Sequence, residues 1–533
     1  MKDTYRKLVA SEWVGPLVLA FIHLVLAALS FHQAPFTGGD DATYIALARS
    51  LIERHDYRDI WDPLLPLHTQ YPPIFPVVVA GGLLAGFQPQ EGMKLLMMFI
   101  STGAVLASCL WLRKVTTPGI AFCAGFFVAI SPEILWLGQE ILSDPLFWLF
   151  AMLALIAWRH ADRSREDSNT PMPVTAVLVA TTLILAGYFT RSAGVPLLLA
   201  VGVWLLFRKE YRTIGIVLLM SVPLIFAWWL RGHGHGAGGY LAPFIAVDPY
   251  NPALGHVTAK GLAERVAENF SEYAQRHLAR LVFGSERTGV IFGVAFAAAM
   301  LWGWATRVRK RPGLAEVWLP IYLALVTLWP VAWAGARFLF PIVPLLALYV
   351  GESIAQLAKA ASHPRVFAVA LLLAGVVTVQ PGLRRQIKTG SACRERFYSG
   401  EQFPCVMPAF ADFFMTAENV RGKLPPKSVV LSRKPTIFYV HSGYQSVLYP
   451  LFPVPDSLFN LAKRVGAQYV VVDQILDLAP KYLHPILLAR RDDFCVVRDL
   501  SSDDATFVRI EVGGPRRGPG TAPNSFRVCG VTK

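Results

Sequence analysis

The sequence predicts a polytopic, all-helical membrane module over residues 1–380, followed by a soluble α/β domain over residues 381–533. Hydrophobic residues make up 54% of the 533 residues and charged residues only 16%, and the mean hydropathy is +0.44. This composition is too apolar for an ordinary soluble protein. Lys and Arg lie in short clusters between apolar runs, and from Gln380 onward the composition becomes that of a soluble domain.

About eleven apolar runs are predicted to be membrane-spanning helices, because a helix needs about 20 apolar residues to cross the hydrocarbon core. They are Trp13 to Phe31, Met93 to Leu112, Ile120 to Leu137, Pro145 to Trp158, Val174 to Phe189, Val195 to Phe207, Ile214 to Leu230, Gly289 to Ala305, Val317 to Ala334, Phe338 to Ile354 and Val366 to Val379. Because so many runs follow the first, we expect it to be an uncleaved helix rather than a signal peptide.

The basic clusters alternate with these runs, and this alternation predicts a cytoplasmic amino terminus. The clusters that then face the cytoplasm are Arg113-Lys114, Arg159 to Arg165, Arg208 to Arg212, Arg307 to Arg311 and Lys359 to Arg365. The number of crossings is odd, so the C-terminal domain is expected outside the cytoplasm, in a multi-pass protein of the inner (plasma) membrane. The net charge of +14 is explained by this topology, and we expect no nucleic-acid partner.

Two long stretches are predicted to be external loops. The first is Phe31 to Glu91, and its apolar segment Pro72 to Phe87 is expected to be a short re-entrant or interfacial helix, because a full span there would place Arg113-Lys114 outside. The second is Arg231 to Thr288, which contains the amphipathic segment Thr258 to Leu281, predicted to be helical. Loops of this length between helices are usually functional.

The C-terminal domain is predicted to alternate strands and helices, which is typical of an α/β fold. The predicted strands are Ser428 to Ser432, Ser446 to Tyr449, Tyr469 to Asp473, Phe494 to Arg498 and Thr506 to Glu511. The predicted helices are Pro408 to Arg421, Thr436 to Ser442, Ser457 to Val465 and Lys481 to Ala489. The Gly/Pro-rich tail after Gly513 is expected to be loose.

The positions of the cysteines agree with a C-terminal domain outside the cytoplasm. Cys109 and Cys123 lie in apolar runs, whereas four cysteines lie in the expected external domain: Cys393, Cys405, Cys495 and Cys529. An even set in an oxidising compartment indicates two disulfides. Near neighbours close the smaller loops, so we predict the pairs Cys393–Cys405 and Cys495–Cys529; the alternative is four unpaired thiols.

Asp40 and Asp41 are the first candidates for chemistry, because they form an acidic pair just after the first apolar run, at the start of a helical pattern. One alternative is that they only cap the helix and complement its dipole. A single carboxylate would satisfy that role, so the second is free for another. Paired carboxylates suit a general base, a divalent-cation ligand, or both.

Further charged residues are predicted on the same side of the membrane. Asp144, preceded by Glu140, lies at the external end of the third predicted span, where it could instead be a helix cap. Arg191 and Arg337 lie at external helix ends, against the positive-inside rule. An arginine there either reaches the lipid headgroups or pairs with a phosphate or carboxylate. Together with Asp40, these residues indicate an acid-plus-phosphate site.

Several aromatic and histidine residues accompany these motifs. His68 and Tyr71 precede the re-entrant segment, whose two prolines turn the chain back to the surface. Tyr44 follows the acidic pair, and we expect all three side chains to contact substrate. His233 and His235 could hold a metal, but a Gly-rich pair of this kind is more often part of a loop.

From Trp13 to Tyr349 the chain resembles the C-type (GT-C) membrane glycosyltransferases that use polyprenyl-phosphate sugars. Within them it is most similar to the bacterial protein O-mannosyltransferase and lipid A aminoarabinose transferase branch. The resemblance is carried by Gly39-Asp40-Asp41-Ala42-Thr43-Tyr44, Tyr71-Pro72-Pro73-Ile74, Leu142-Ser143-Asp144-Pro145, Phe189-Thr190-Arg191 and the segment from Ala336-Arg337 to Pro344. These short motifs agree in both order and membrane side, so the resemblance implies the GT-C fold.

The resemblance also implies roles. Asp40 matches the acidic residue that acts as base or orients the acceptor, and Asp41 stands where the family often has Glu. Asp144 matches a second acidic loop, and Arg191 and Arg337 match basic positions near the lipid phosphate. The chain departs from the branch before the first proline, where Tyr71 replaces the usual Lys.

The expected function is therefore transfer of a hexose or pentose from a polyprenyl-phosphate donor to an acceptor at the extracytoplasmic membrane surface. Arginines stabilise the departing phosphate, and a carboxylate deprotonates or orients the acceptor hydroxyl. The expected partners are the lipid-linked sugar and membrane lipid, and the acceptor stays open between protein, lipid A and glycan. The cofactor hypothesis is a divalent cation at Asp41 and Asp144. The alternatives are a lipid-linked sugar flippase or transporter, and a sensor or assembly protein.

Overall fold

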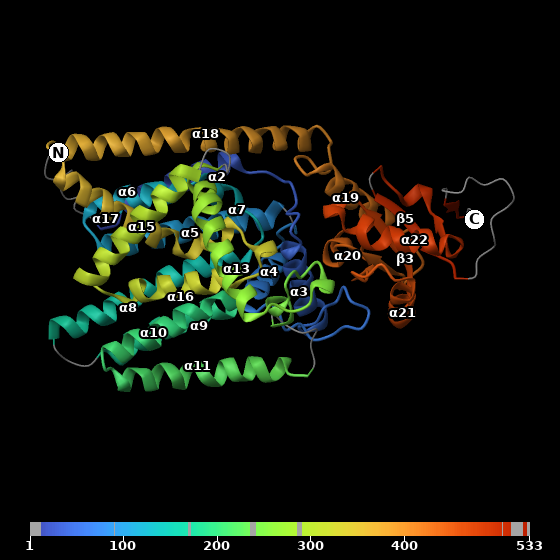
Figure 1. Ribbon diagram of the computed structural model, residues 1–533, viewed down its shortest axis with the longest axis horizontal. Coiled ribbons are helices and arrows are strands. Elements are labelled where there is room, and N and C mark those ends of the chain that lie inside the picture. The colour runs from blue at the N-terminus through green and yellow to red at the C-terminus, as the bar shows by residue number, and fades with distance from the viewer. Residues whose placement is uncertain are drawn as a thin grey trace.

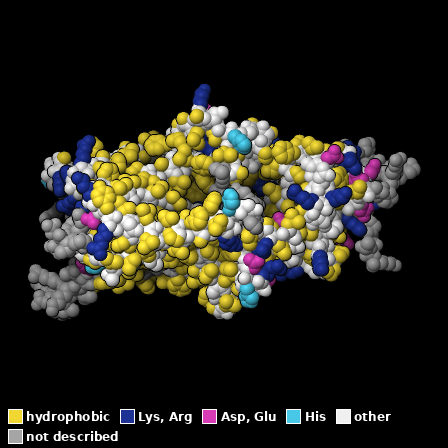
Figure 2. All heavy atoms as spheres, turned by 90° about the horizontal axis from the view of Figure 1, so that it is seen from below, with side chains coloured by type: hydrophobic (Ala, Val, Ile, Leu, Met, Phe, Trp, Pro, Cys, Tyr) yellow, Lys and Arg dark blue, Asp and Glu magenta, His cyan; other side chains and the backbone are white. Residues whose placement is uncertain are grey.

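The computed structural model describes residues 12–89, 91–168, 172–234, 241–284, 290–503, 505–512 and 526–529. Long helices lie side by side along the long axis of the molecule, and the C-terminal domain sits at one end of them (Figure 1). Figure 2 shows a broad hydrophobic surface around the middle of the membrane module, with Lys and Arg gathered at its far end and over the C-terminal domain. This distribution fits a protein whose middle part lies in a bilayer.

Each predicted span coincides with or overlaps a helix. These helices are α2 (Val14–Ser30), α5 (Glu91–Val115), α6 (Pro118–Ala129), α8 (Ser143–Ser168), α9 (Val174–Thr190), α10 (Val195–Phe207), α11 (Tyr211–Gly232), α15 (Val290–Lys310), α16 (Leu314–Leu328), α17 (Val343–Ala360) and α18 (Pro364–Tyr398). Within the described residues, 4 helical stretches are long and apolar enough to cross a membrane, namely Glu91–Val115, Tyr211–Gly232, Ala336–Ala360 and Val366–Tyr398. The count of about eleven crossings stays a prediction.

One predicted span is divided. The run from Ile120 to Leu137 forms α6 and the separate short helix α7 (Pro132–Leu137), so the expectation of one continuous helix is wrong. The break falls at Ser131, just before a proline that cannot donate a backbone hydrogen bond. The Ser131 hydroxyl donates to the carbonyl of Leu281 at 2.6 Å and accepts from the amide of Ile134. The break thereby ties this end of the module to the second external loop.

The two stretches predicted to be external loops contain the expected helices. In the first loop, α3 (Asp40–Arg54) packs against α4 (Ile74–Leu84). Helix α4 has 11 residues, about 16 Å of helix, which is too short to cross a core of about 30 Å. In the second loop, α13 (Ala259–Glu272) is followed by a π-helical turn and by α14 (Leu278–Phe283).

Helix α18 joins the two parts of the protein. It has 35 residues, or about 52 Å of helix, so it is longer than the membrane core is thick. The boundary expected at residue 381 falls inside this helix. Near its end Arg394 donates to the carbonyl of Phe31 at 2.7 Å, at the carboxyl end of α2, where a cation is favourable. The disulfide Cys393–Cys405 closes the next turn, as predicted.

The C-terminal domain is a six-stranded mixed sheet in the order β2-β1-β3-β5-β4-β6, covered by helices. Its strands are β1 (Val429–Ser432), β2 (Gln445–Leu448), β3 (Ala467–Asp473), β4 (Phe494–Val496), β5 (Ala505–Ile510) and β6 (Arg527–Val528). Its main helices are α19 (Pro408–Val420), α20 (Pro435–Ser442), α21 (Pro455–Val465) and α22 (His484–Ala489). Strand β1 pairs in parallel with β2 and β3, and apolar side chains pack against both faces of the sheet. The prediction of an α/β domain is confirmed.

The tail of this domain is only partly described. Residues 513–525 lie outside the described residues, but β6 pairs in parallel with β4. The second predicted disulfide, Cys495–Cys529, is present beside this pairing. At this point the tail is therefore part of the sheet rather than loose.

Candidate active site

The acidic pair lies in the first turn of α3. The residue that precedes the helix is Gly39, whose φ of 93° favours glycine, and neither Asp40 nor Asp41 makes a side-chain cap. Neither carboxylate is therefore the N-cap residue itself, but both lie in the first turn of α3, where they complement the helix dipole.

Asp40 is held by two side chains from distant parts of the sequence. Its Oδ2 accepts a hydrogen bond from Arg337 Nη1 at 2.7 Å, and its Oδ1 accepts one from Tyr71 Oη at 3.0 Å. Arg337 lies in a 3₁₀ segment, Ala336–Ile342, that leads into α17. The side chains of Asp40 and Arg337 are 23% and 24% exposed, so a molecule outside the protein can reach this ion pair.

A second ion pair lies beside the first. Arg191, in an extended residue after α9, donates to Asp144 Oδ2 at 2.7 Å and to the Ser143 hydroxyl at 3.2 Å. The same hydroxyl lies 2.9 Å from Tyr44 Oη. The Asp144 side chain is only 2% exposed, so it can neutralise and orient Arg191 but is closed to solvent.

Phe338 brings the two arginines together. The guanidinium carbons of Arg191 and Arg337 each lie 5.1 Å from the centre of its ring. Cation–π contacts of this kind hold two like charges close at low cost. The four residues that the sequence placed on one side of the membrane, Asp40, Asp144, Arg191 and Arg337, thus converge at one place.

The two neighbouring carboxylates have opposite pKa shifts. Burial alone would raise the pKa of Asp40, but the charge and hydrogen bond of Arg337 outweigh burial and lower it. The pKa of Asp41 is raised to about 7, mainly by burial and then by the nearby carboxylate of Glu140. Oδ1 of Asp41 is buried and has no hydrogen-bond partner in the described part of the chain. The environment therefore holds Asp40 ionised and favours the neutral form of Asp41.

Asp41 predicts a pH-dependent stability. Its pKa rises from 3.8 to about 7 on folding, so the unfolded chain loses this proton first and stability falls as the pH rises between these values. About 3 pKa units correspond to roughly 4 kcal/mol. Asp41→Asn is expected to raise the melting temperature clearly at pH 8 and much less at pH 5. The exposed Asp456, changed to Asn, serves as control, and equal effects of Asp41→Asn at both pH values would contradict this account.

The remaining predicted contact residues surround the acidic pair. The rings of Tyr44 and Tyr71 lie 5.0 Å apart. His68 is buried, with Nδ1 at 2.6 Å from Asp59 Oδ1 and Nε2 at 2.9 Å from the amide of Tyr71. Because that amide must donate, Nε2 is the acceptor and Nδ1 carries the proton. His68 thus orients Tyr71, and its expected contact with substrate stays a prediction.

Sequence reasoning missed a contribution from the C-terminal domain. Lys434 Nζ donates to the carbonyl of Gly38 at 2.8 Å, and the Thr436 hydroxyl donates to the carbonyl of Gly39 at 3.4 Å. Burial and the neighbouring Arg433 lower the pKa of Lys434 to about 8. No sequence signal points to this lysine, because it lies 396 residues from its partner.

The described residues contain no group of three or more His, Cys, Asp or Glu side chains that could share a metal ion. Of the two carboxylates expected to hold a cation, Asp144 is bonded to Arg191. The divalent cation stays a prediction, and we derive no step through one. The ring of His233 lies 4.7 Å from that of Trp229, tilted against it, and His235 lies outside the described residues.

Comparison with known proteins identifies the fold. No protein-family model and no curated protein matches this sequence. Among solved structures, the oligosaccharyltransferase of Archaeoglobus fulgidus, tethered with an acceptor peptide, has a TM-score of 0.58 and 12% identity over 94% of this chain and 74% of its own. The same enzyme with Zn and sulfate has a TM-score of 0.56 at 14% identity, with the same coverage. ArnT of Cupriavidus metallidurans, bound to undecaprenyl phosphate, has a TM-score of 0.54 at 14% identity over 95% of this chain and 100% of its own.

Proposed function

We propose that this chain, which has the fold of the GT-C glycosyltransferases, transfers a sugar from a polyprenyl-phosphate donor to an acceptor at the extracytoplasmic membrane surface. The observation that carries the proposal is the meeting of an accessible ion pair, Asp40–Arg337, with a buried one, Asp144–Arg191. A solved neighbour of this fold binds undecaprenyl phosphate and another was captured with an acceptor peptide, which supports a lipid-linked donor and a separate acceptor.

In the proposed reaction the acceptor hydroxyl oxygen attacks the anomeric carbon of the sugar. The bond from that carbon to the phosphate oxygen breaks, and polyprenyl phosphate leaves with the electron pair. Arg337 stabilises the charge that develops on the phosphate, because it is the more exposed of the two arginines, at 24% against 16%. Arg191 adds positive potential from behind Phe338, in an orientation set by Asp144.

Asp40 receives or orients the proton of the acceptor hydroxyl. In the free protein, Arg337 lowers the pKa of this carboxylate and so weakens it as a base. When the donor phosphate draws Arg337 toward itself, Asp40 loses that stabilisation and its burial raises the pKa, because burial disfavours the charged form. Donor binding would in this way produce a better base at the moment when the acceptor needs one.

Lys434 is proposed to supply the cation that the branch usually carries at the position of Tyr71. Tyr71 donates to Asp40, and Lys434 reaches the neighbouring turn from the C-terminal domain. Its pKa of about 8 keeps most of the molecules cationic at neutral pH. Lys434→Met is expected to raise the KM for the donor about tenfold, the usual effect of losing one charge-assisted contact. A matched control is the exposed Lys463→Met on α21, and an unchanged donor KM in Lys434→Met would contradict this role.

The proposed sidedness can be tested with reporters fused after the exposed Gly400, beyond the end of α18. Alkaline phosphatase at this site is expected to be active and green fluorescent protein to be dark, because an odd number of crossings places the site outside the cytoplasm. The same fusions between α8 and α9 should give the opposite result. A bright fluorescent fusion at Gly400 would show that the candidate site faces the cytoplasm, and this result would contradict the proposal.

The assay for the function uses the purified protein in vesicles with a panel of polyprenyl-phosphate sugars and protein, lipid A and glycan acceptors. A transferase releases polyprenyl phosphate and labels one class of acceptor. A flippase or transporter would instead move the intact lipid-linked sugar between leaflets, and that outcome would replace the proposal. The assay would also identify the sugar.

A further inference from the structure

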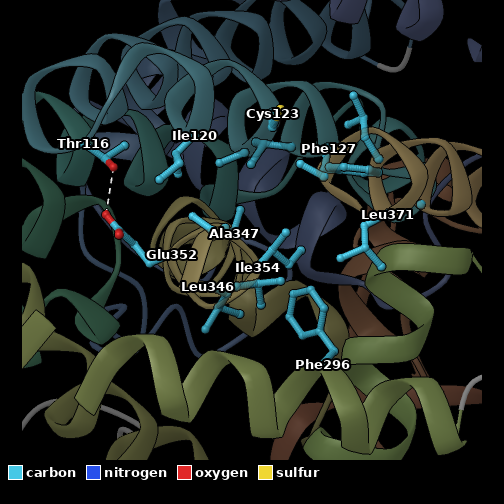
Figure 3. Close-up of a pocket in the computed structure, with 18 of the residues that line it drawn as sticks. Thr116, Ile120, Cys123, Phe127, Phe296, Leu346, Ala347, Glu352, Ile354 and Leu371 are labelled. Carbon is cyan, nitrogen blue, oxygen red and sulfur yellow. Dashed lines mark hydrogen bonds between the residues drawn. The ribbon is translucent and has the colours of Figure 1, made fainter. Parts of the chain in front are cut away.

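A large cavity lies in the membrane module, between α6, α15, α17 and α18. Its volume is about 970 Å³, near the upper end of cavities that hold small ligands. Figure 3 shows side chains of all four helices around it, among them Cys123, Phe296, Leu346 and Leu371. None of the four paired residues around Asp40 lines this cavity, so it is separate from the candidate active site.

The cavity is long and mostly apolar. On α6 its lining runs from Gly119 to Val128, and on α17 from Val343 to Lys359. At 1.5 Å per residue these stretches are about 14 and 24 Å long. The lining residues recur every three or four positions, so each helix contributes one face. Half of a hydrocarbon core of about 30 Å is about 15 Å, so the cavity can take a chain that extends through a whole leaflet.

Unpaired positive charge marks one end. Lys310, Arg311 and Lys359 line this end, and all three are exposed. Within the described part of the chain their side chains make no ion pair or hydrogen bond. This end belongs to the side of the module far from the C-terminal domain, where Lys and Arg gather in Figure 2.

The carboxylate at the same end is already paired. Glu352 accepts hydrogen bonds from Thr116 at 2.8 Å, drawn as a dashed line in Figure 3, and from Arg307 at 3.2 Å. Arg307 also pairs with Glu316 at 2.8 Å. Among the described residues at this end, four cations (Arg307, Lys310, Arg311 and Lys359) face two carboxylates, so an excess of positive charge remains, which is favourable for an anionic group.

We propose that this cavity binds one anionic phospholipid, with an acyl chain between α6, α17 and α18 and its headgroup phosphate at Lys310, Arg311 and Lys359. The apolar walls match a hydrocarbon chain, and a basic pocket between membrane helices is suited to an anionic headgroup. The bound lipid fills the space between α18 and the rest of the module. It thereby fastens the helix that carries the C-terminal domain.

The first test compares retained lipid in purified full-length protein by native mass spectrometry, after exchange with phosphatidylglycerol or phosphatidylcholine vesicles. The rim variant is K310Q/R311Q/K359Q. The control, K209Q/R212Q/R309Q, removes the same charge from residues that do not line the cavity. Wild type and control are expected to retain phosphatidylglycerol in preference to phosphatidylcholine. The rim variant should bind phosphatidylglycerol about a hundredfold more weakly, since each basic residue near a membrane contributes about fivefold.

Cys123 provides a second readout, because this free thiol lines the cavity while Cys109 is buried and the other four cysteines are in disulfides. Bound phosphatidylglycerol should slow its alkylation by an apolar maleimide in wild type and control, and not in the rim variant. Equal retention by rim variant and control would overturn the proposal. Equal protection by the two phospholipids, or protection by polyprenyl phosphate in place of phosphatidylglycerol, would overturn it as well. None of these measurements depends on glycosyl transfer.

Discussion

Asp40→Asn is expected to lower the rate of sugar transfer by about a hundredfold or more, the usual range for loss of a positioned acid or base. The substitution keeps the size of the side chain and its bond from Tyr71, but it removes the charge that faces Arg337. Because this pair is partly exposed, water can solvate Arg337 and the fold should survive. The measurement is turnover in vesicles, with thermal unfolding as the check on folding.

A matched control for Asp40 exists in the same external loop. Asp56 is also a carboxylate paired with an arginine, Arg58, but the proposal gives this pair no role in transfer. Asp56→Asn is expected to leave turnover within a factor of two. If folded Asp40→Asn transfers sugar at the normal rate, Asp40 only completes an ion pair and the proposed mechanism is wrong.

Arg337→Ala is expected to reduce kcat/KM for the lipid-linked donor by about a hundredfold or more, because truncating one partner of a charged contact with a ligand costs about 2–5 kcal/mol. Arg337→Lys should recover only part of the loss, since lysine lacks the planar fork that binds a phosphate through two bonds. Truncation also frees Asp40, so its pKa should rise and the acid limb of the pH–rate profile should move to higher pH.

Arg58→Ala is the corresponding control, because it removes an arginine from a partly exposed pair in the same loop. The double variant Asp40→Asn/Arg337→Ala should be less impaired than the product of the single effects, since the two residues are in direct contact. A normal donor kcat/KM in Arg337→Ala would remove this residue from the proposed site and leave Arg191 as the candidate.

Much of the fold could be predicted from the sequence because hydropathy determines how deep a segment lies in the membrane. An apolar run such as Val174 to Phe189 has one stable position in a bilayer, and the observed helix ends at Thr190, one residue beyond the prediction. The same reasoning placed Asp40, Asp144, Arg191 and Arg337 at one membrane surface. The two disulfides could be predicted because four cysteines lie in the domain expected outside the cytoplasm, and because near neighbours close the shortest loops.

Hydropathy predicts how deep a segment lies in the membrane, but the sequence did not determine which helices are neighbours within the membrane plane. Packing decided that Arg337 pairs with Asp40 and Arg191 with Asp144, although either arginine could have taken either carboxylate. It also buried Asp144 while it left Asp40 accessible, which separates a positioning residue from a candidate base.

By itself, therefore, the sequence determined the membrane module, the gathering of its paired charged residues at one place, the cysteine pairs and the α/β class of the C-terminal domain. Only the tertiary structure decided the partners of each charge, the place of Phe338 between two arginines and the reach of Lys434 to Gly38. The physical reason is that burial in lipid depends on the composition of each segment alone. Lateral contacts depend on the shapes of side chains that lie hundreds of residues apart.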